Sequence, residues 1–475
     1  MEESFNQTDR SKIPLNRVLG LSTGILLVAG TMIGSGAFKK IAPMAQTGLN
    51  EILILLAWIV AGIITMFGAF TYAGLASLTN KTGGVYEYLR LVYGDFIAFL
   101  FGWVIFLMGG SGAIAALAFV FSQSANNLFH FPNPFDSLKD FSLGNFIFPF
   151  ASSGVKIFAL LVIIILTWVN TRGVKNGGVL NNVVTAAKIL GILTIIIWGL
   201  FYSGAQPANA TATVPEISSG LAAFSAFFGA MLSALWAYDG WANITYVTGE
   251  IRNPQKNVPL AIMGGVGIAM TLYVLLNFVF MRVMPLQNLA AVGENQIAAT
   301  EVARVLMGNP GHIVISVLIM VSTFGAVNAC IIVYPRVYYR MAQENAFFKK
   351  ASYVHPVFRT PYISLIYSCI WSCILVITGT FDLLTNLVIF SGYLFFILVV
   401  WGMMRLKSKG VILTKVIGYP VIPIIIILFS FILVGNTFIV EPRQSVIGLA
   451  LVLSGIPFFY LFKKNKSVEN TGEPL

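Results

Sequence analysis

The sequence predicts an all-α membrane protein with twelve transmembrane helices, and three observations support this fold class. Apolar residues make up 57% of the 475 residues and charged residues only 10%, whereas ordinary soluble domains carry about 25% charged residues. Apolar runs recur along the chain, and each is about as long as the ~20 residues that a helix needs to cross a bilayer. The runs are continuously apolar rather than alternating, which argues against a transmembrane β-barrel.

The predicted spans share this apolar character and are separated by short polar segments. They cover residues 19–43, 50–78, 91–124, 153–171, 178–202, 219–248, 259–284, 311–342, 361–379, 382–404, 415–440 and 445–462.

The basic residues are distributed unevenly between the two sides of the predicted bundle. With the N-terminus inside, 21 of the 29 Lys and Arg residues fall on the cytoplasmic side. Basic residues concentrate in the cytoplasmic loops of membrane proteins, so both termini are predicted to be cytoplasmic and the cell membrane is the expected location. The net charge of +11 is thereby explained by topology, and a nucleic-acid partner is not expected.

Two spans contain a glycine-rich interruption near mid-membrane. The first reads Gly-Thr-Met-Ile-Gly-Ser-Gly at 30–36, and the sixth reads Leu-Trp-Ala-Tyr-Asp-Gly-Trp at 235–241. Glycine weakens a helix by about 1 kcal/mol relative to alanine. Because these spans lie five apart, the pattern fits two five-helix repeats of opposite topology, each beginning with a discontinuous helix.

This pattern predicts five parts of the chain. Residues 1–18 form a cytoplasmic segment, 19–202 the first repeat, 203–404 the second, inverted repeat, 405–462 two further helices, and 463–475 a cytoplasmic tail.

The first interruption, Gly34-Ser35-Gly36, suits an anion. Non-helical backbone at membrane depth is tolerated where it lines a protected cavity. There, freed N–H groups and the positive end of the second half-helix can hold a carboxylate. Close helix packing through Gly30 and Gly34 is the alternative explanation.

The sixth span offers the opposite polarity. Its interruption exposes carbonyls near residues 235–238, which suit an ammonium group. Asp239 either caps the second half-helix or contacts the substrate. Trp236 is either a lid over the substrate side chain or a packing residue.

Lys188 lies deep in the fifth span, with no acidic residue within one helical turn. Its ammonium could bridge helices in place of a metal cation, take up and release a proton, or reach the interface by snorkelling. The three histidines cannot pair to hold a membrane-embedded metal or haem, and the three cysteines give no disulfide framework. We therefore expect no catalytic residue, no metal and no cofactor.

Six stretches carry further motifs. They read GTMIGSGAF at 30–38, KTGGVYEYL at 81–89, NTRGVK at 170–175, LWAYDGW at 235–241, YVTGEIRNP at 246–254 and PRVYYRM at 335–341. Together they resemble the amino acid–polyamine–organocation superfamily, and its L-type amino-acid transporter branch in particular, from about residue 17 to residue 462.

The resemblance implies a fold similar to that of the leucine transporter, with discontinuous helices 1 and 6. It implies that Ile33, Gly34, Ser35 and Gly36 hold the substrate carboxylate. It implies also that the carbonyls of Trp236, Ala237 and Tyr238 hold the amino group, with Trp236 as the gate.

The resemblance further implies that Lys188, faced by Ser322 and Thr323, occupies the place of a sodium ion. Some animal members join a glycoprotein through a cysteine between helices three and four. This chain has no cysteine there, so no disulfide-linked subunit is expected. One departure is Gly74, which stands where the family usually has glutamate in the second helix.

The resulting functional prediction is sodium-independent exchange of small neutral L-amino acids by alternating access. The alternatives are a proton-coupled amino-acid symporter and a transport-inactive amino-acid sensor. Met108, Asn328 and Ser391 are further predicted pocket residues. Lys39 and Lys40 are expected to make the outer vestibule positive and to disfavour cationic substrates.

Overall fold

The computed structural model describes residues 19–76, 84–144, 147–173, 177–204, 220–412 and 416–471, which are mainly helical. The helices, in chain order, are α1 (Leu21–Met32), α2 (Gly36–Lys39), α3 (Ile41–Ala45), α4 (Glu51–Ala76), α5 (Val85–Tyr93), α6 (Asp95–Val104), the π-helix η2 (Ile105–Gly109), α7 (Gly110–Phe129), the 3₁₀-helix η3 (Asp136–Leu138), α8 (Ser153–Thr171), α9 (Gly177–Leu200), α10 (Gly220–Tyr238), the 3₁₀-helix η4 (Trp241–Glu250), α11 (Pro254–Val283), α12 (Leu286–Ala290), α13 (Ala298–Val333), α14 (Pro335–Gln343), the 3₁₀-helix η5 (Lys349–Ser352), α15 (Tyr362–Thr378), α16 (Phe381–Ser408), α17 (Val421–Val440) and α18 (Pro442–Thr471).

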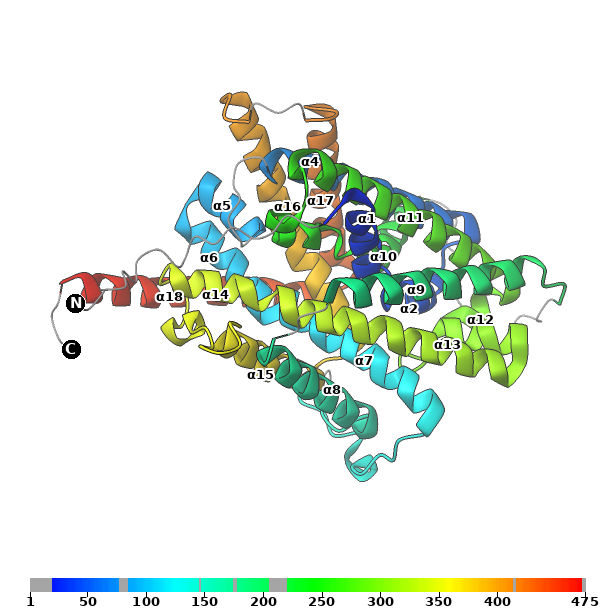
Figure 1. Cartoon of the computed structure of the whole chain (residues 1–475). Coiled ribbons are helices and arrows are strands. Elements are labelled where there is room, and N and C mark those ends of the chain that lie inside the picture. Colours follow the sequence, from blue (N-terminus) through cyan, green and yellow to red (C-terminus); the bar gives the residue numbers. More distant parts are fainter. Residues whose placement is uncertain are drawn as a thin grey trace.

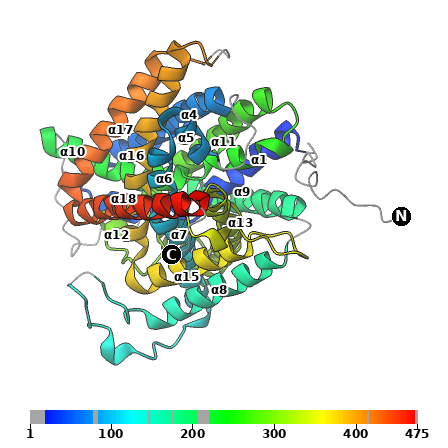
Figure 2. The same cartoon turned by 90° about the vertical axis from the view of Figure 1, so that its left-hand side faces the viewer.

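The helices form one bundle around α1, α7, α10 and α13. Figure 1 shows α9 and α7 running beside α13, and both pack against it. Helix α18 packs across α6 and α16 (Figure 2). Its C-terminal end and α12 lie at opposite ends of the bundle. Over the described ranges, extended pairing is limited to two isolated bridges, Leu19 with Ile251 and Leu143 with Ile147.

The all-helical membrane class is confirmed. Among the described residues, nine helical segments are long and apolar enough to cross a membrane. Three further apolar helices are shorter and coincide with predicted spans: Leu21–Met32, Val184–Leu200 and Tyr362–Thr378.

Both predicted interruptions are present. Helix α1 ends at Met32, Ile33 leaves helical geometry with a ψ of 88°, and α2 begins at Gly36. Helix α10 ends at Tyr238, and Gly240 has a φ of +100° before η4 begins. A positive φ is easy for glycine and costly for other residues, so Gly240 permits this second change of direction.

Two span boundaries differ from the sequence prediction. The third span is helical from Asp95 to Phe129 and contains the π-turn η2. The eighth span begins at Ala298 and bends at Gly308, which has a φ of 67° and a ψ of −155°. The prediction started this span at residue 311, because the preceding turns are too polar to read as membrane-spanning.

Ion pairs join α5, α6 and α14 at the end of the bundle opposite α12. The Arg340 side chain binds Glu87 at 2.7 Å and Glu344 at 2.6 Å, while Arg90 binds Glu344 at 2.7 Å and Asp95 at 2.8 Å. Only 4% of the Glu87 side chain is exposed. A buried carboxylate requires such a partner, so this network fixes α5 against α14.

Replacing Arg340 with alanine is therefore expected to destabilise the protein. Removing one partner of a buried pair costs about 3–5 kcal/mol because it strands the other charge. We expect a lower melting temperature in detergent for Arg340→Ala, and recovery of most of the loss in the double variant Arg340→Gln/Glu87→Gln. An unchanged melting temperature in Arg340→Ala would contradict a structural role for the pair.

Candidate functional site

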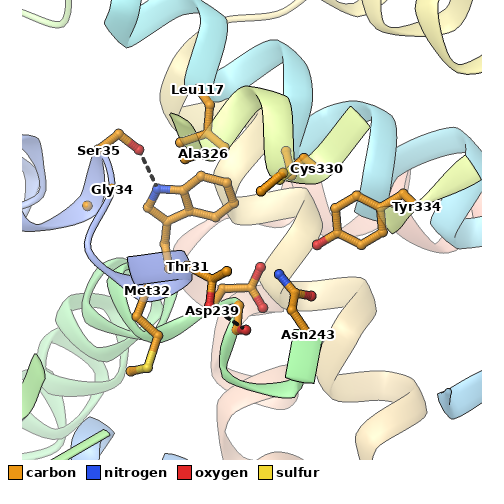
Figure 3. A pocket seen from close by; sticks show the side chains of 15 residues that line it. Thr31, Met32, Gly34, Ser35, Leu117, Asp239, Asn243, Ala326, Cys330 and Tyr334 are labelled. Atoms are coloured by element: carbon orange, nitrogen blue, oxygen red, sulfur yellow. Dashed lines mark hydrogen bonds between the residues drawn. The ribbon is translucent and has the colours of Figure 1, made fainter. Parts of the chain in front are cut away.

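A small cavity lies between the two interrupted helices (Figure 3). It is lined by Thr31, Met32, Gly34, Ser35, Gly36, Ala113, Leu117, Trp236, Asp239, Gly240, Asn243, Ala326, Ala329, Cys330 and Tyr334. Its volume is about 40 Å³, and one water requires about 10–15 Å³ on this measure. The cavity therefore has room for about three water molecules, which restricts it to a small ligand.

One wall of the cavity is the interruption between α1 and α2. Gly34, Ser35 and Gly36 all line it. The first N–H groups of a helix have no acceptor within that helix, and α2 begins at this wall. A methyl group at Gly36 would lie 2.5 Å from the Cα of Ala237, so glycine is what allows α2 to approach α10 this closely.

The opposite wall is the end of α10. The Asp239 and Asn243 side chains lie beside each other at the cavity (Figure 3). The backbone N–H of Asp239 donates to the carbonyl of Trp236 at 3.1 Å. The Thr31 hydroxyl lies 3.1 Å from the carbonyl of Gly240 and 2.9 Å from that of Val28 in its own helix, so its single proton is shared between α1 and the second interruption.

Trp236 lies between the cavity and the end of the bundle at which α12 lies. Its indole N–H donates to the Ser35 hydroxyl at 3.2 Å, as Figure 3 shows. Its ring meets that of Phe381 edge-on, with centroids 6.2 Å apart. The predicted gate residue and the predicted carboxylate ligand are thus hydrogen-bonded to each other.

Lys188 lies behind the first interruption. Its amine is buried and donates to the carbonyls of Gly30 and Ile33, each at 3.0 Å. The Ser322 hydroxyl also donates to the Ile33 carbonyl, at 3.1 Å. A helix C-terminus carries partial negative charge on its carbonyls, so the ammonium compensates the buried, interrupted end of α1.

Several predicted residues are placed differently from the prediction. Thr323 is buried, but its hydroxyl bonds to Ile319 of its own helix at 2.7 Å. The Ala237 carbonyl accepts from the Tyr273 hydroxyl at 3.0 Å. The Tyr238 hydroxyl donates to the Trp58 carbonyl at 3.0 Å, and Tyr238 does not line the cavity.

Met108, Asn328 and Ser391 do not line the cavity, which corrects their prediction as pocket residues. Met108 is buried in η2, Asn328 accepts from the Asn170 amide at 2.6 Å, and Ser391 bonds to its own helix at 3.2 Å. Sequence alone does not determine which residues within one turn of a helix point toward a cavity. On α13, the cavity is lined by the neighbouring Cys330 and Ala329 instead.

Sequence reasoning missed several cavity residues. Asn243 and Thr31 carry a signal, since each is a polar side chain next to an interruption at membrane depth. Leu117 and Cys330 carry none, because apolar residues on a buried helix do not reveal which of them face a cavity.

Two buried lysines lie at the end of the site nearer to α12. Each of the Lys39 and Lys40 amines lies 4.8 Å from the centroid of the Phe381 ring. The Lys40 amine pairs with the Asp382 carboxylate at 2.6 Å, and the Lys39 amine donates to Gln123 at 2.7 Å. The predicted positive vestibule is therefore wrong, since both lysines are buried, Lys40 is paired with Asp382, and the Lys39 amine donates to neutral oxygens of Gln123 and Glu294.

The hydrogen bond between Trp236 and Ser35 leads to a testable prediction. A neutral hydrogen bond contributes about 0.5–1.5 kcal/mol, so Trp236→Phe and Ser35→Ala should each change substrate affinity by about 2- to 12-fold. Because both remove the same bond, we expect the double variant to resemble either single variant in a binding assay. Additive effects would show that the two side chains act independently.

A multi-helix membrane bundle with two interrupted helices facing a small polar cavity defines a solute transporter. Residues 19–460 match the family model described as amino acid permease. The chain belongs to this family, within the amino acid–polyamine–organocation superfamily.

Curated relatives cover almost the whole chain. It is 33% identical to the serine/threonine exchanger SteT of Bacillus subtilis, over 95% of this chain and 98% of that protein. It is 31% identical to the mouse b(0,+)-type amino acid transporter 1, over 97% and 91% of the two chains. It is 30% identical to the human large neutral amino acids transporter small subunit 2, over 94% and 81%.

Proposed function

We propose that the protein exchanges small neutral L-amino acids across the cell membrane by alternating access, without sodium. The observation that carries this proposal is the cavity between the interruptions at Gly34–Gly36 and Asp239–Gly240. Backbone N–H groups at one wall suit a carboxylate, and the C-terminal end of α10 at the other suits an ammonium group.

The roles of the individual residues follow from this polarity. Ile33, Gly34, Ser35 and Gly36 form the carboxylate side, with the Ile33 carbonyl turned toward Lys188. The end of α10, from Trp236 to Asp239, forms the ammonium side, and Trp236 closes over the substrate.

The size of the cavity supports a small neutral substrate. Leu117, Cys330 and Tyr334 surround the space that a side chain would occupy, and none of them carries a charge that would pair with a charged side chain. One relative is named for large neutral amino acids, whereas serine and threonine, for which another relative is named, are small enough to suit this cavity.

Lys188 supports sodium independence. Its ammonium already binds the carbonyls at the interrupted end of α1. The partial negative charge of this helix end is therefore balanced without a sodium ion. Exchange follows because an empty cavity would leave both interruptions without their charged partner during reorientation.

Counterflow in proteoliposomes tests the function. Vesicles loaded with each of the twenty amino acids in turn are given trace radiolabelled L-serine, in sodium or in potassium buffer. We expect accumulation with internal serine, threonine and alanine, equal in both buffers. Sodium-dependent accumulation, or accumulation only with large or cationic amino acids, would contradict the proposal.

The same vesicles separate exchange from the two alternatives. If Lys188 released a proton in the cycle, a pH jump would drive uptake into vesicles that contain no amino acid. A transport-inactive sensor would bind serine without any flux.

We further propose that the nine long and three shorter apolar helices found among the described residues form twelve spans, arranged as two five-helix repeats, residues 19–202 and 203–404, and two further helices. The termini are then cytoplasmic, and the ion pairs of Arg340 face the cytoplasm. The segment between α7 and α8 contains no cysteine, so no disulfide-linked subunit is required.

A further inference from the structure

A cavity of about 430 Å³ opens at the end of the bundle opposite α12, between α6, the segment that follows α14, and α18. It shares no lining residue with the cavity between the interruptions. The rings of Phe99 and Phe96 lie 5.5 Å and 5.1 Å from that of Phe459, centroid to centroid, so aromatic packing joins α6 to α18 here. The aromatic wall of the cavity is formed by Tyr93, Phe96, Phe99, Phe459, Tyr460 and Phe462.

The charged rim of this cavity lies at the boundary between apolar and polar sequence. Asp95 is the first residue of one apolar span, Asp95–Phe129, and Lys463 is the last residue of another, Pro442–Lys463. Both residues line the cavity. Because the ends of membrane spans lie at the level of the lipid headgroups, the cavity opens where the headgroups of one leaflet lie.

Charges of both signs are present at this rim. Three carboxylates of the ion-pair network share two guanidinium groups, so the network has one more negative than positive charge. Two of these carboxylates, those of Asp95 and Glu344, line the cavity together with Lys463. The Asp95 side chain is 60% exposed and accepts from Arg90 through Oδ1 at 2.8 Å. A ligand that carries an ammonium group and a phosphate is complementary to this rim, and the aromatic rings also favour the ammonium group.

An apolar face of α18 continues from the aromatic wall. Val446, Leu449, Leu453 and Tyr460 are all exposed, and their spacing places them on one side of the helix. From Val446 to Tyr460 the helix rises about 21 Å, which is more than the ~15 Å of hydrocarbon in one leaflet. An acyl chain can therefore extend along this face from a headgroup held in the cavity, whereas a soluble cation gains nothing from it.

We propose that this cavity binds the headgroup of a zwitterionic aminophospholipid, phosphatidylethanolamine, in the leaflet at this end of the bundle. The ammonium group binds Asp95 and the aromatic wall, the phosphate binds Lys463, and an acyl chain lies along α18. The lipid thereby bridges α6 and α18. This inference requires that the chain spans a membrane, but it does not depend on the amino-acid exchange proposed above.

Native mass spectrometry of the purified, delipidated full-length protein tests the proposal. Dioleoyl phosphatidylethanolamine and dioleoyl phosphatidylglycerol, which have the same acyl chains, are titrated separately. We expect the ethanolamine lipid to bind about two- to five-fold more tightly, as a partly exposed charge pair allows. Asp95→Asn should remove this preference by weakening the ethanolamine lipid alone, and Lys463→Gln should weaken both lipids.

Asp140→Asn and Lys409→Gln are the matched controls, because both side chains are exposed and neither lines the cavity. Both should bind the two lipids as the wild type does. Melting temperatures in lipid-free detergent show whether each variant is folded.

Two results would overturn the lipid site directly: equal affinities for the two lipids in the wild type, or a preference that survives Asp95→Asn. Glycerophosphoethanolamine carries the same headgroup without acyl chains, and it should not displace the lipid at equal concentration. Displacement would show that the cavity holds a soluble solute and that α18 contributes no binding surface for an acyl chain.

Discussion

Replacing Gly36 with alanine is expected to reduce exchange at least ~100-fold, since a displacement of about 1 Å at a binding site can have this effect. The added methyl group would lie 2.5 Å from the Cα and 2.6 Å from the Cβ of Ala237. These atoms belong to the backbone and the first side-chain carbon of Ala237, which cannot move aside as the end of a flexible side chain can. Helix α2 must therefore move away from α10. The cavity between the interruptions then loses its geometry. Counterflow of radiolabelled L-serine measures the effect.

Gly267→Ala is the matched control for this substitution. Gly267 lies within α11, and a methyl group there would meet nothing within 4 Å. Alanine in a helix is favoured over glycine by about 1 kcal/mol, so the control should fold and transport normally. If Gly36→Ala transported as well as this control, the two interruptions would not need to be in contact.

Replacing Lys188 with methionine is expected to abolish exchange while keeping the side-chain volume similar. The Gly30 carbonyl loses its Lys188 donor, whereas the Ile33 carbonyl retains Ser322. Each orphaned buried group costs about 1–3 kcal/mol, which is about 5- to 150-fold in affinity. We expect a corresponding rise in the dissociation constant for L-serine, and no counterflow above background in potassium buffer.

Lys139→Met is the control for loss of a lysine charge. Lys139 is 56% exposed and pairs only loosely with Asp136, at 3.6 Å, so its removal should leave counterflow unchanged. Normal exchange by Lys188→Met would show that the ammonium does not support the broken end of α1.

The sequence was informative about the fold because hydropathy and glycine placement act locally. The interruptions at Gly34–Gly36 and at Gly240 follow from residues that weaken a helix, and the structure has both. Lys188 was predicted to lie deep in a span without a nearby acid, and its buried amine donates to two backbone carbonyls.

The cavity wall was harder to predict, because it depends on which face of a helix meets its neighbours. Asn328 was predicted to face the cavity and instead bonds to Asn170 of α8. Leu117 lines the cavity through its position on α7, which nothing in its residue type reveals. Lys39 and Lys40 were misjudged for a related reason, since their hydrogen-bond and ion-pair partners on α7, in the segment before α13 and on α16 are far away in sequence.

One hydroxyl group joins the two interrupted helices from behind. The Tyr273 hydroxyl is buried and lies 2.8 Å from the Met32 carbonyl and 3.0 Å from the Ala237 carbonyl. Its single proton is shared between the last turns of α1 and α10, so α11 clamps both helices. When the site changes sides, these three helices should therefore rotate together as one rigid body, and the flexing must fall on the far side of the interruptions, in α2 and η4.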